Sequence, residues 1–311
     1  MSKDSSAMDA FNEKFSTDQQ CAEALFHARW PDGFRCPICR HPEYYLTRTR
    51  RHPLFECKSC RHQTSLIAGT IMGGSSTSLS KWFKAFYLMS LPGGISAVRL
   101  SEAIEVTYKT AWLMAHKIRE AMRTAEQSVK LEGVVQVSTF GYGYALFFDA
   151  HQPVLLGGSF NEQGELQQIK LQQPDPDHVR LPARTVDKEG YRAFLAEHVN
   201  SSEVTSLPYY AKVHPQLGPF RLTVKNWLNS TFGGIGAKHL HAYLNEYSFR
   251  INAEMYDVEG TSFRSLLSWC ATTAKITYRY LIRPRRILPI VWKQFETKAK
   301  WIARHREAWS Y

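Results

Sequence analysis

The stretch Cys36 to Cys60, CPICRHPEYYLTRTRRHPLFECKSC, decides the fold of the N-terminal region. It holds two Cys-x-x-Cys pairs, Cys36 with Cys39 and Cys57 with Cys60, separated by seventeen residues. Two such pairs can fold over each other and present four thiolates to one zinc ion. A single pair is also compatible with redox chemistry, but two pairs that flank a strand-like segment favour metal. Because the protein supplies all four ligands, the sequence predicts a structural zinc ribbon.

The charge of the chain indicates a polyanionic partner. Its 311 residues carry 39 Lys and Arg against 28 Asp and Glu, a net charge of +11. The excess is concentrated at 35–61 and 275–306, and clustered cations neutralise neighbouring phosphates and release counterions. A simply basic soluble protein remains the alternative.

The length and the apolar segments bound the class of protein. A chain of this length fills about two domains. Its apolar runs are shorter than the ~20 residues of a membrane span, so no membrane partner is expected. The first ten residues are polar, without an apolar signal core, which favours a cytoplasmic location with reduced cysteines. Cys21 and Cys270 have no ligand spacing and are expected to be small buried residues.

Three helical segments follow the ribbon. Apolar spacing predicts a helix over 78–91, and two more over 96–105 and 108–123, with the Thr107 hydroxyl capping the last. The last two helices have the layout of a helix-turn-helix, whose second helix enters the major groove with its first residues nearest the bases. A plain helical hairpin is the alternative. The candidate DNA-contacting residues here and in the ribbon are Arg48, Arg50, Arg51, Tyr108, Lys109, Thr110, Lys117 and Arg119.

The order of these parts resembles that of bacterial insertion-sequence transposases of the zinc-ribbon, DDE (ribonuclease-H-like) type. The resemblance rests on the four cysteines, Gly69-Thr70-Ile71-Met72, Gly93-Gly94-Ile95-Ser96 and Tyr108-Lys109-Thr110-Ala111-Trp112. It resumes in Lys238-His239-Leu240, Tyr243-Leu244-Asn245-Glu246 and Phe249-Arg250-Ile251-Asn252. Between these motifs it implies a ribonuclease-H-like domain, and strand-like segments at 134–140, 153–160 and 166–172, a helix at 191–198 and a short strand ending near Val204 agree with that.

The resemblance also implies that the metal-binding carboxylates of the family are replaced in this chain. Transposases of this type cut and join DNA by an in-line displacement at phosphorus. They use two divalent metal ions that are held by carboxylates. The two family aspartates correspond to Ser138 and Ser206, and the third ligand to Thr223, two residues before the retained Lys225. A neutral hydroxyl is a poor ligand for Mg²⁺. The sequence therefore predicts no catalytic residue and no cleavage.

An active enzyme with displaced acids is the alternative hypothesis. Asp149, Asp187, Glu189 and Glu246 are the acids that could rebuild a site for Mg²⁺ or Mn²⁺. Each is expected instead to be a surface or capping carboxylate, and Glu246 to be a structural ion-pair or hydrogen-bond partner.

The sequence thus predicts an α+β multidomain chain. Its expected parts are a helical lead-in (1–29), the zinc ribbon (30–74), the helix-turn-helix (78–127), a ribonuclease-H-like α/β domain (131–268) and a basic helical C-terminal extension (269–311). The expected function is recognition of double-stranded DNA, including transposon ends, without cutting. The expected cofactor is structural zinc, and a homo-oligomer or an active transposase is left open as protein partner. A zinc-ribbon module that binds only protein is a third hypothesis, which the clustered charge disfavours.

Overall fold

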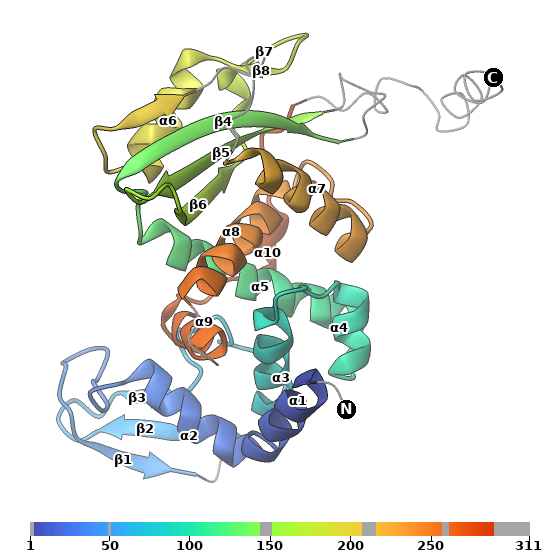
Figure 1. Ribbon diagram of the computed structural model, residues 1–311. Helices are drawn as coiled ribbons and strands as arrows, with labels where there is room; N and C mark the ends of the chain where they lie inside the picture. Colours follow the sequence, from blue (N-terminus) through green and yellow to red (C-terminus); the bar gives the residue numbers. More distant parts are fainter. Residues whose placement is uncertain (1–2, 49–50, 144–150, 207–215, 257–260, 289–311) are drawn as a thin grey trace. The chain divides into compact units, whose positions relative to one another are not determined.

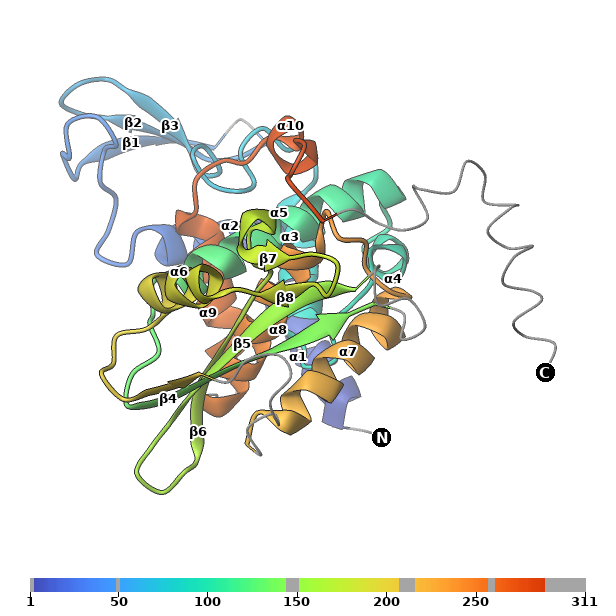
Figure 2. The same ribbon diagram turned by 90° about the horizontal axis from the view of Figure 1, so that it is seen from above.

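A computed structural model describes residues 3–48, 51–143, 151–206, 216–256 and 261–288 (Figures 1 and 2). It is a mixed α/β structure that divides into two compact units. Unit 1 comprises 1–126 and 253–283, and unit 2 comprises 127–252 and 284–311. Among the described helices, none combines the length and apolar character needed to cross a membrane.

Unit 1 begins with two helices and the ribbon. They are α1 (Lys3–Lys14), α2 (Asp18–Arg29), β1 (Tyr44–Thr47), β2 (Leu54–Cys57) and β3 (Gln63–Ser65). The strands form an antiparallel sheet in the order β1-β2-β3. Its apolar side is an aromatic cluster in which Phe55 stacks on Phe26 of α2 and contacts Trp30. Helix α2 therefore belongs structurally to the ribbon, although the sequence placed it in a separate lead-in.

The remaining helices of unit 1 are α3 (Leu79–Ser90), α4 (Ala97–Ala103), α5 (Tyr108–Gln127), α9 (Thr261–Thr272) and α10 (Tyr278–Ile282). Helix α9 begins in the segment 131–268, which the sequence assigned to the ribonuclease-H-like domain, and ends in the predicted C-terminal extension, yet it packs in unit 1. Phe263 explains the difference, because its ring joins an aromatic cluster with Phe11, Phe15 and Phe83. Of the predicted C-terminal extension, residues 289–311 lie outside the described part of the chain.

Unit 2 is built on a four-stranded sheet. Its strands are β4 (Val134–Tyr142), β5 (Gln152–Phe160), β6 (Leu166–Gln172) and β9 (Val204–Ser206), in the order β6-β5-β4-β9. The first three are antiparallel neighbours, and β9 runs parallel to β4. The helices are α6 (Lys188–His198), α7 (Gly218–Phe232) and α8 (Leu240–Tyr256), and β7 (Val179–Arg180) pairs with β8 (Thr185–Val186) in a small hairpin.

Helices cover both faces of this sheet (Figure 1). Phe140, Leu156 and Ile169 pack against residues of α7 and α8, whereas Val135, Val137 and Leu155 pack against Phe194 of α6. Gly157 and Gly158 in β5 make this close packing possible. A Cβ at Gly157 would lie 2.8 Å from the ring of Phe194, and one at Gly158 would lie 2.7 Å from Leu217.

Helix α8 also meets the outer edge of the sheet. Asn252 accepts a hydrogen bond from the Ile169 amide at 2.8 Å and donates to the Ile169 carbonyl at 3.0 Å, and the Ser248 hydroxyl accepts from the Leu171 amide at 3.1 Å. Buried side chains thus satisfy backbone groups that an edge strand leaves open.

A candidate zinc centre and nucleic-acid interface

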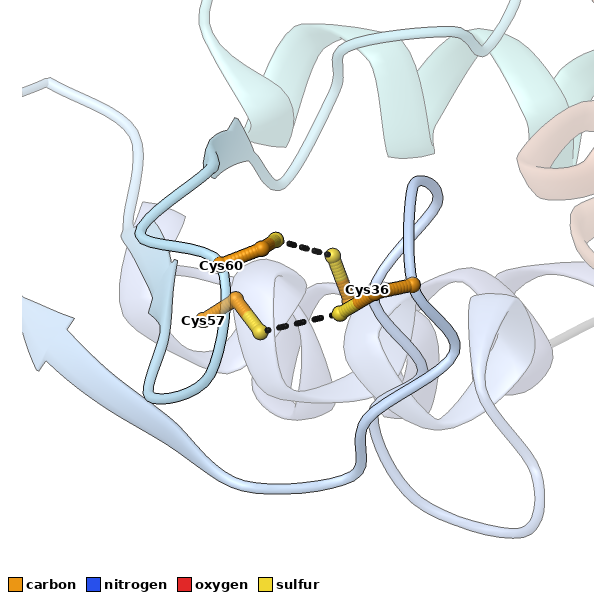
Figure 3. Close-up of side chains that lie close together, drawn as sticks. Cys36, Cys57 and Cys60 are labelled. Atoms are coloured by element: carbon orange, nitrogen blue, oxygen red, sulfur yellow. Dashed lines mark hydrogen bonds between the residues drawn. The ribbon is translucent and has the colours of Figure 1, made fainter.

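The four ribbon cysteines converge on one point. Figure 3 shows three of them, Cys36, Cys57 and Cys60, with their side chains turned toward one another. All four Sγ atoms lie within 4.8 Å of one another, and the Cys36–Cys60 and Cys39–Cys57 sulfur pairs are each 3.5 Å apart. Four sulfurs around one zinc ion at about 2.3 Å need a cluster of this size. Among the described residues, this is the one group of three or more His, Cys, Asp or Glu side chains whose ligand atoms lie close enough together to hold a metal ion.

The electrostatics of this cluster call for a cation. Burial would raise the pKa of Cys36, but hydrogen bonds from the Cys39 and Ile38 amides and from neighbouring thiols lower it to about 6. For Cys60, an amide hydrogen bond from His62 would lower the pKa, but burial and the other three thiols raise it to about 12. The four thiols cannot all ionise side by side without compensating charge, and a zinc ion supplies that charge. The donor set therefore fits a structural zinc.

The two cysteine pairs have the same local backbone. In each, the second cysteine is followed by Arg-His, and the first cysteine's amide bonds to the histidine's carbonyl: Cys36 to His41 at 3.1 Å and Cys57 to His62 at 3.0 Å. The turn requires a left-handed residue after the second cysteine. Arg40 adopts φ 65° and Arg61 adopts φ 59°. Left-handed conformations are unfavourable for residues with a Cβ. The two exposed arginines therefore occupy positions whose backbone conformation glycine would adopt without strain.

Cations gather around an exposed tyrosine on the ribbon. Tyr45 is 51% exposed, and both the Lys58 ammonium and the Arg61 guanidinium lie 5.5 Å from its ring centroid. Arg61 also pairs with Glu56 at 3.3 Å. The predicted contact residues Arg48 and Arg51 are exposed, while Arg50 lies outside the described residues.

The start of α5 is exposed, as expected for the second helix of a helix-turn-helix. The Thr107 hydroxyl accepts from the Thr110 amide at 3.3 Å, which confirms the predicted cap. Tyr108 is 54% exposed, Lys109 is exposed, and Thr110 is half-buried.

Two predicted contact residues on α5 are not on the surface. Lys117 and Arg119 are buried, because the helix is enclosed along the consecutive residues 114–119. Neither side chain lies on the exposed surface that carries Tyr108.

The two serines of the expected catalytic site lie on neighbouring parallel strands. Ser206 ends β9 and pairs in register with Val137, the residue before Ser138 on β4. Val204 packs on the α6 side with Val135 and Val137. Strand alternation places Ser206 on that side, and Ser138 on the α7 and α8 side with Phe140.

The third position and its lysine lie on α7. The Thr223 hydroxyl lies 2.7 Å from the Tyr247 hydroxyl of α8. Lys225 extends toward β4, with its ammonium 5.5 Å from the ring centroid of Phe140. Burial, and then the charge of Arg221, lower the pKa of Lys225.

The described alternative acids have other partners. Asp187 caps α6 by accepting from the Gly190 amide, and Glu189 pairs with Arg192 on the surface. Glu246 is fully buried and pairs with Arg250 at 2.5 Å, which confirms its predicted structural role. Asp149 lies outside the described residues.

Comparison with known proteins identifies the class of the N-terminal part. Residues 16–63 match the transposase zinc-ribbon domain family, a segment that includes α2. The chain is also 29% identical over 129 residues to an uncharacterized protein in the transposable element ISH50 of Halobacterium salinarum. That match covers 40% of this chain and 42% of the relative, so it spans less than half the length of either. No solved structure matches the chain. Together, the matches point to a relation with insertion-sequence transposases.

The residues predicted to contact DNA do not include four exposed residues of the zinc ribbon. Arg40, Arg61, Lys58 and Tyr45 were not among the predicted contact residues. The repeated Cys-x-x-Cys-Arg-His pattern was the available signal for the two arginines.

Proposed function

We propose that this protein binds DNA as a relative of insertion-sequence transposases and does not cut it. The proposal includes a ribonuclease-H-like fold for unit 2. Supporting that assignment are the strand order β6-β5-β4-β9, the parallel pairing of β9 with β4, and the helix α6 that precedes β9 in the chain.

The substituted metal positions carry the proposal. Ser138, Ser206 and Thr223 offer hydroxyls where two metal ions ~4 Å apart would need charged oxygens. In addition, alternation along the paired strands separates Ser138 from Ser206, and Thr223 is hydrogen-bonded to Tyr247. The active alternative is disfavoured because Asp187, Glu189 and Glu246 are engaged elsewhere.

DNA recognition is assigned to the ribbon and to the start of α5, used as the second helix of a helix-turn-helix. The exposed cations and aromatic rings there suit phosphate contact and stacking. Such a protein would act as a regulator or competitor of an active transposase, alone or as an oligomer.

A paired binding and cleavage assay tests the proposal. The zinc-loaded chain is mixed with duplexes that carry element ends, with Mg²⁺ or Mn²⁺. We expect a salt-sensitive complex and intact strands. Metal-dependent nicking that is lost on changing Asp149, Asp187 or Glu189 would establish the active alternative instead. Absence of any DNA complex would favour a protein-binding module.

A further inference from the structure

Lys117 is a buried lysine that has no ion-pair partner in the described part of the chain. Its side chain is 6% exposed, and its ammonium lies 6.0 Å from the ring centroid of Trp82. Among the described residues, it has no hydrogen-bond or ion-pair partner. Buried charges are normally paired, because desolvation of an unpaired ion is unfavourable. The position of Lys117 therefore calls for an anion.

A second lysine, Lys275 in the segment after α9, approaches the same place. Trp82, whose ring lies beside Lys117, donates to the hydroxyl of Ser75 at 3.1 Å, and Ser75 follows Gly74 in the chain. Lys275 lies across Gly73 and Gly74: a Cβ on Gly73 would be 3.2 Å from its Cδ, and a Cβ on Gly74 would be 3.2 Å from its Nζ. Burial, and then the positive charge of Lys275, lower the pKa of Lys117. The two ammonium groups thus repel each other, and the two glycines leave the space that Lys275 occupies.

Two acids, Glu120 of α5 and Asp18 of α2, have other hydrogen-bond partners. Glu120, one turn along α5, bonds to Arg123 at 2.5 Å and to the Tyr280 hydroxyl at 3.2 Å. Asp18 accepts from the Ser80 amide at the start of α3. Among the described residues, neither Lys117 nor Lys275 forms an ion pair with a carboxylate.

We propose that Lys117 and Lys275 form a site for a phosphate group, held beside Gly73 and Gly74. A phosphate between two ammonium groups would relieve their repulsion and make charge-assisted hydrogen bonds with both. The assignment of this phosphate to the backbone of duplex DNA rests on the proposed function, whereas the site itself does not.

Inorganic phosphate tests the site directly. The melting temperature of the zinc-loaded full chain is measured in phosphate and in chloride at constant ionic strength. The variants are Lys117→Met, Lys275→Met and, as a control, the exposed Lys188→Met in unit 2. We expect phosphate to stabilise the wild type and the control, with apparent affinity at least about tenfold weaker in the two site variants. No phosphate effect in the wild type, or an equal effect in all four proteins, would overturn the site.

The Met side chain keeps the length of the lysine stem and removes the charge. Lys117→Met should melt above the wild type in chloride, because it removes a desolvated charge. If that variant does not fold, the surface variant Lys275→Met decides the result alone.

A second arm identifies the source of the phosphate. DNA affinity is followed against salt concentration, and Lys275→Met should lower the slope by about 0.9 for one lost phosphate contact while Lys188→Met leaves it unchanged. An unchanged slope in Lys275→Met, together with a lost phosphate effect, would keep the phosphate site and overturn DNA as its ligand. A wild type that binds phosphate but no DNA would refute the proposed function separately.

Discussion

Replacing Arg40 by glycine separates the backbone role of this position from its charge. Arg40 has φ 65° and is exposed, and it forms no ion pair within the described part of the chain. The left-handed conformation costs a residue with a Cβ roughly 1–2 kcal/mol. Glycine removes that cost but loses about 0.5–1 kcal/mol through the greater freedom of the unfolded chain. The difference between these two terms is about 0–1.5 kcal/mol, and we expect Arg40→Gly to stabilise the ribbon by roughly the middle of that range.

Arg40→Ala is the matched control, because alanine keeps the Cβ and loses only the charge. We expect its stability to remain within about 0.5 kcal/mol of the wild type. Hydrogen exchange of the β1, β2 and β3 amides in zinc-loaded protein measures the stability of the ribbon itself. In a DNA-binding titration against salt, both variants should lower the slope by about 0.9 if Arg40 contacts a phosphate.

The two readouts refute different steps. If Arg40→Gly were no more stable than Arg40→Ala, the argument from left-handed strain would be wrong. If both variants kept the wild-type salt slope, Arg40 would not contact DNA, whatever its effect on stability.

Four further changes test the other parts of the molecule. Cys57→Ser should lose zinc and unfold the ribbon, since a structural zinc supplies on the order of 10 kcal/mol; metal analysis that still finds one tightly bound zinc per chain would contradict this. Lys109→Ala should lower the DNA salt slope by about 0.9, and an unchanged slope would remove the start of α5 from the interface. Aspartates introduced together at Ser138 and Ser206 should give no Mn²⁺-dependent cleavage, because strand alternation places the two side chains on opposite faces of the sheet; nicking of end-containing DNA would disprove this geometry. Burial lowers the pKa of His198 to about 4, so the unfolded chain takes up a proton first as pH falls, and stability should decrease between about pH 6.5 and 4 by up to about 3 kcal/mol. Urea unfolding of His198→Leu at pH 7 and pH 5 should lack this decrease, and an identical fall in both proteins would assign it to other groups.

Local patterns predicted much of this structure. The cysteine spacing predicted the four clustered sulfurs, and the capping residue Thr107 predicted the start of α5. Strand and helix periodicity predicted β4, β5, β6 and α6 to within a few residues. These features depend on neighbours in the chain.

Features that depend on distant packing were not predictable in the same way. The amphipathic pattern of α5 does not reveal that Lys117 and Arg119 are enclosed along with its apolar residues. Likewise, nothing near Phe263 shows that its partners are Phe11 and Phe15, far away in the sequence. For the same reason, the meeting of Lys275 with Gly73 and Gly74 needed the structure.

The contacts between α8 and β6 limit how this protein can assemble. Ser248 and Asn252 already use the amides of Leu171 and Ile169 and the carbonyl of Ile169. A strand from a second copy, or from a related transposase, would have to displace α8 before it could extend the sheet there. Association by strand addition is therefore blocked at the β6 edge, and a partner must dock on side chains or use the opposite side of the sheet, where β9 is the last described strand.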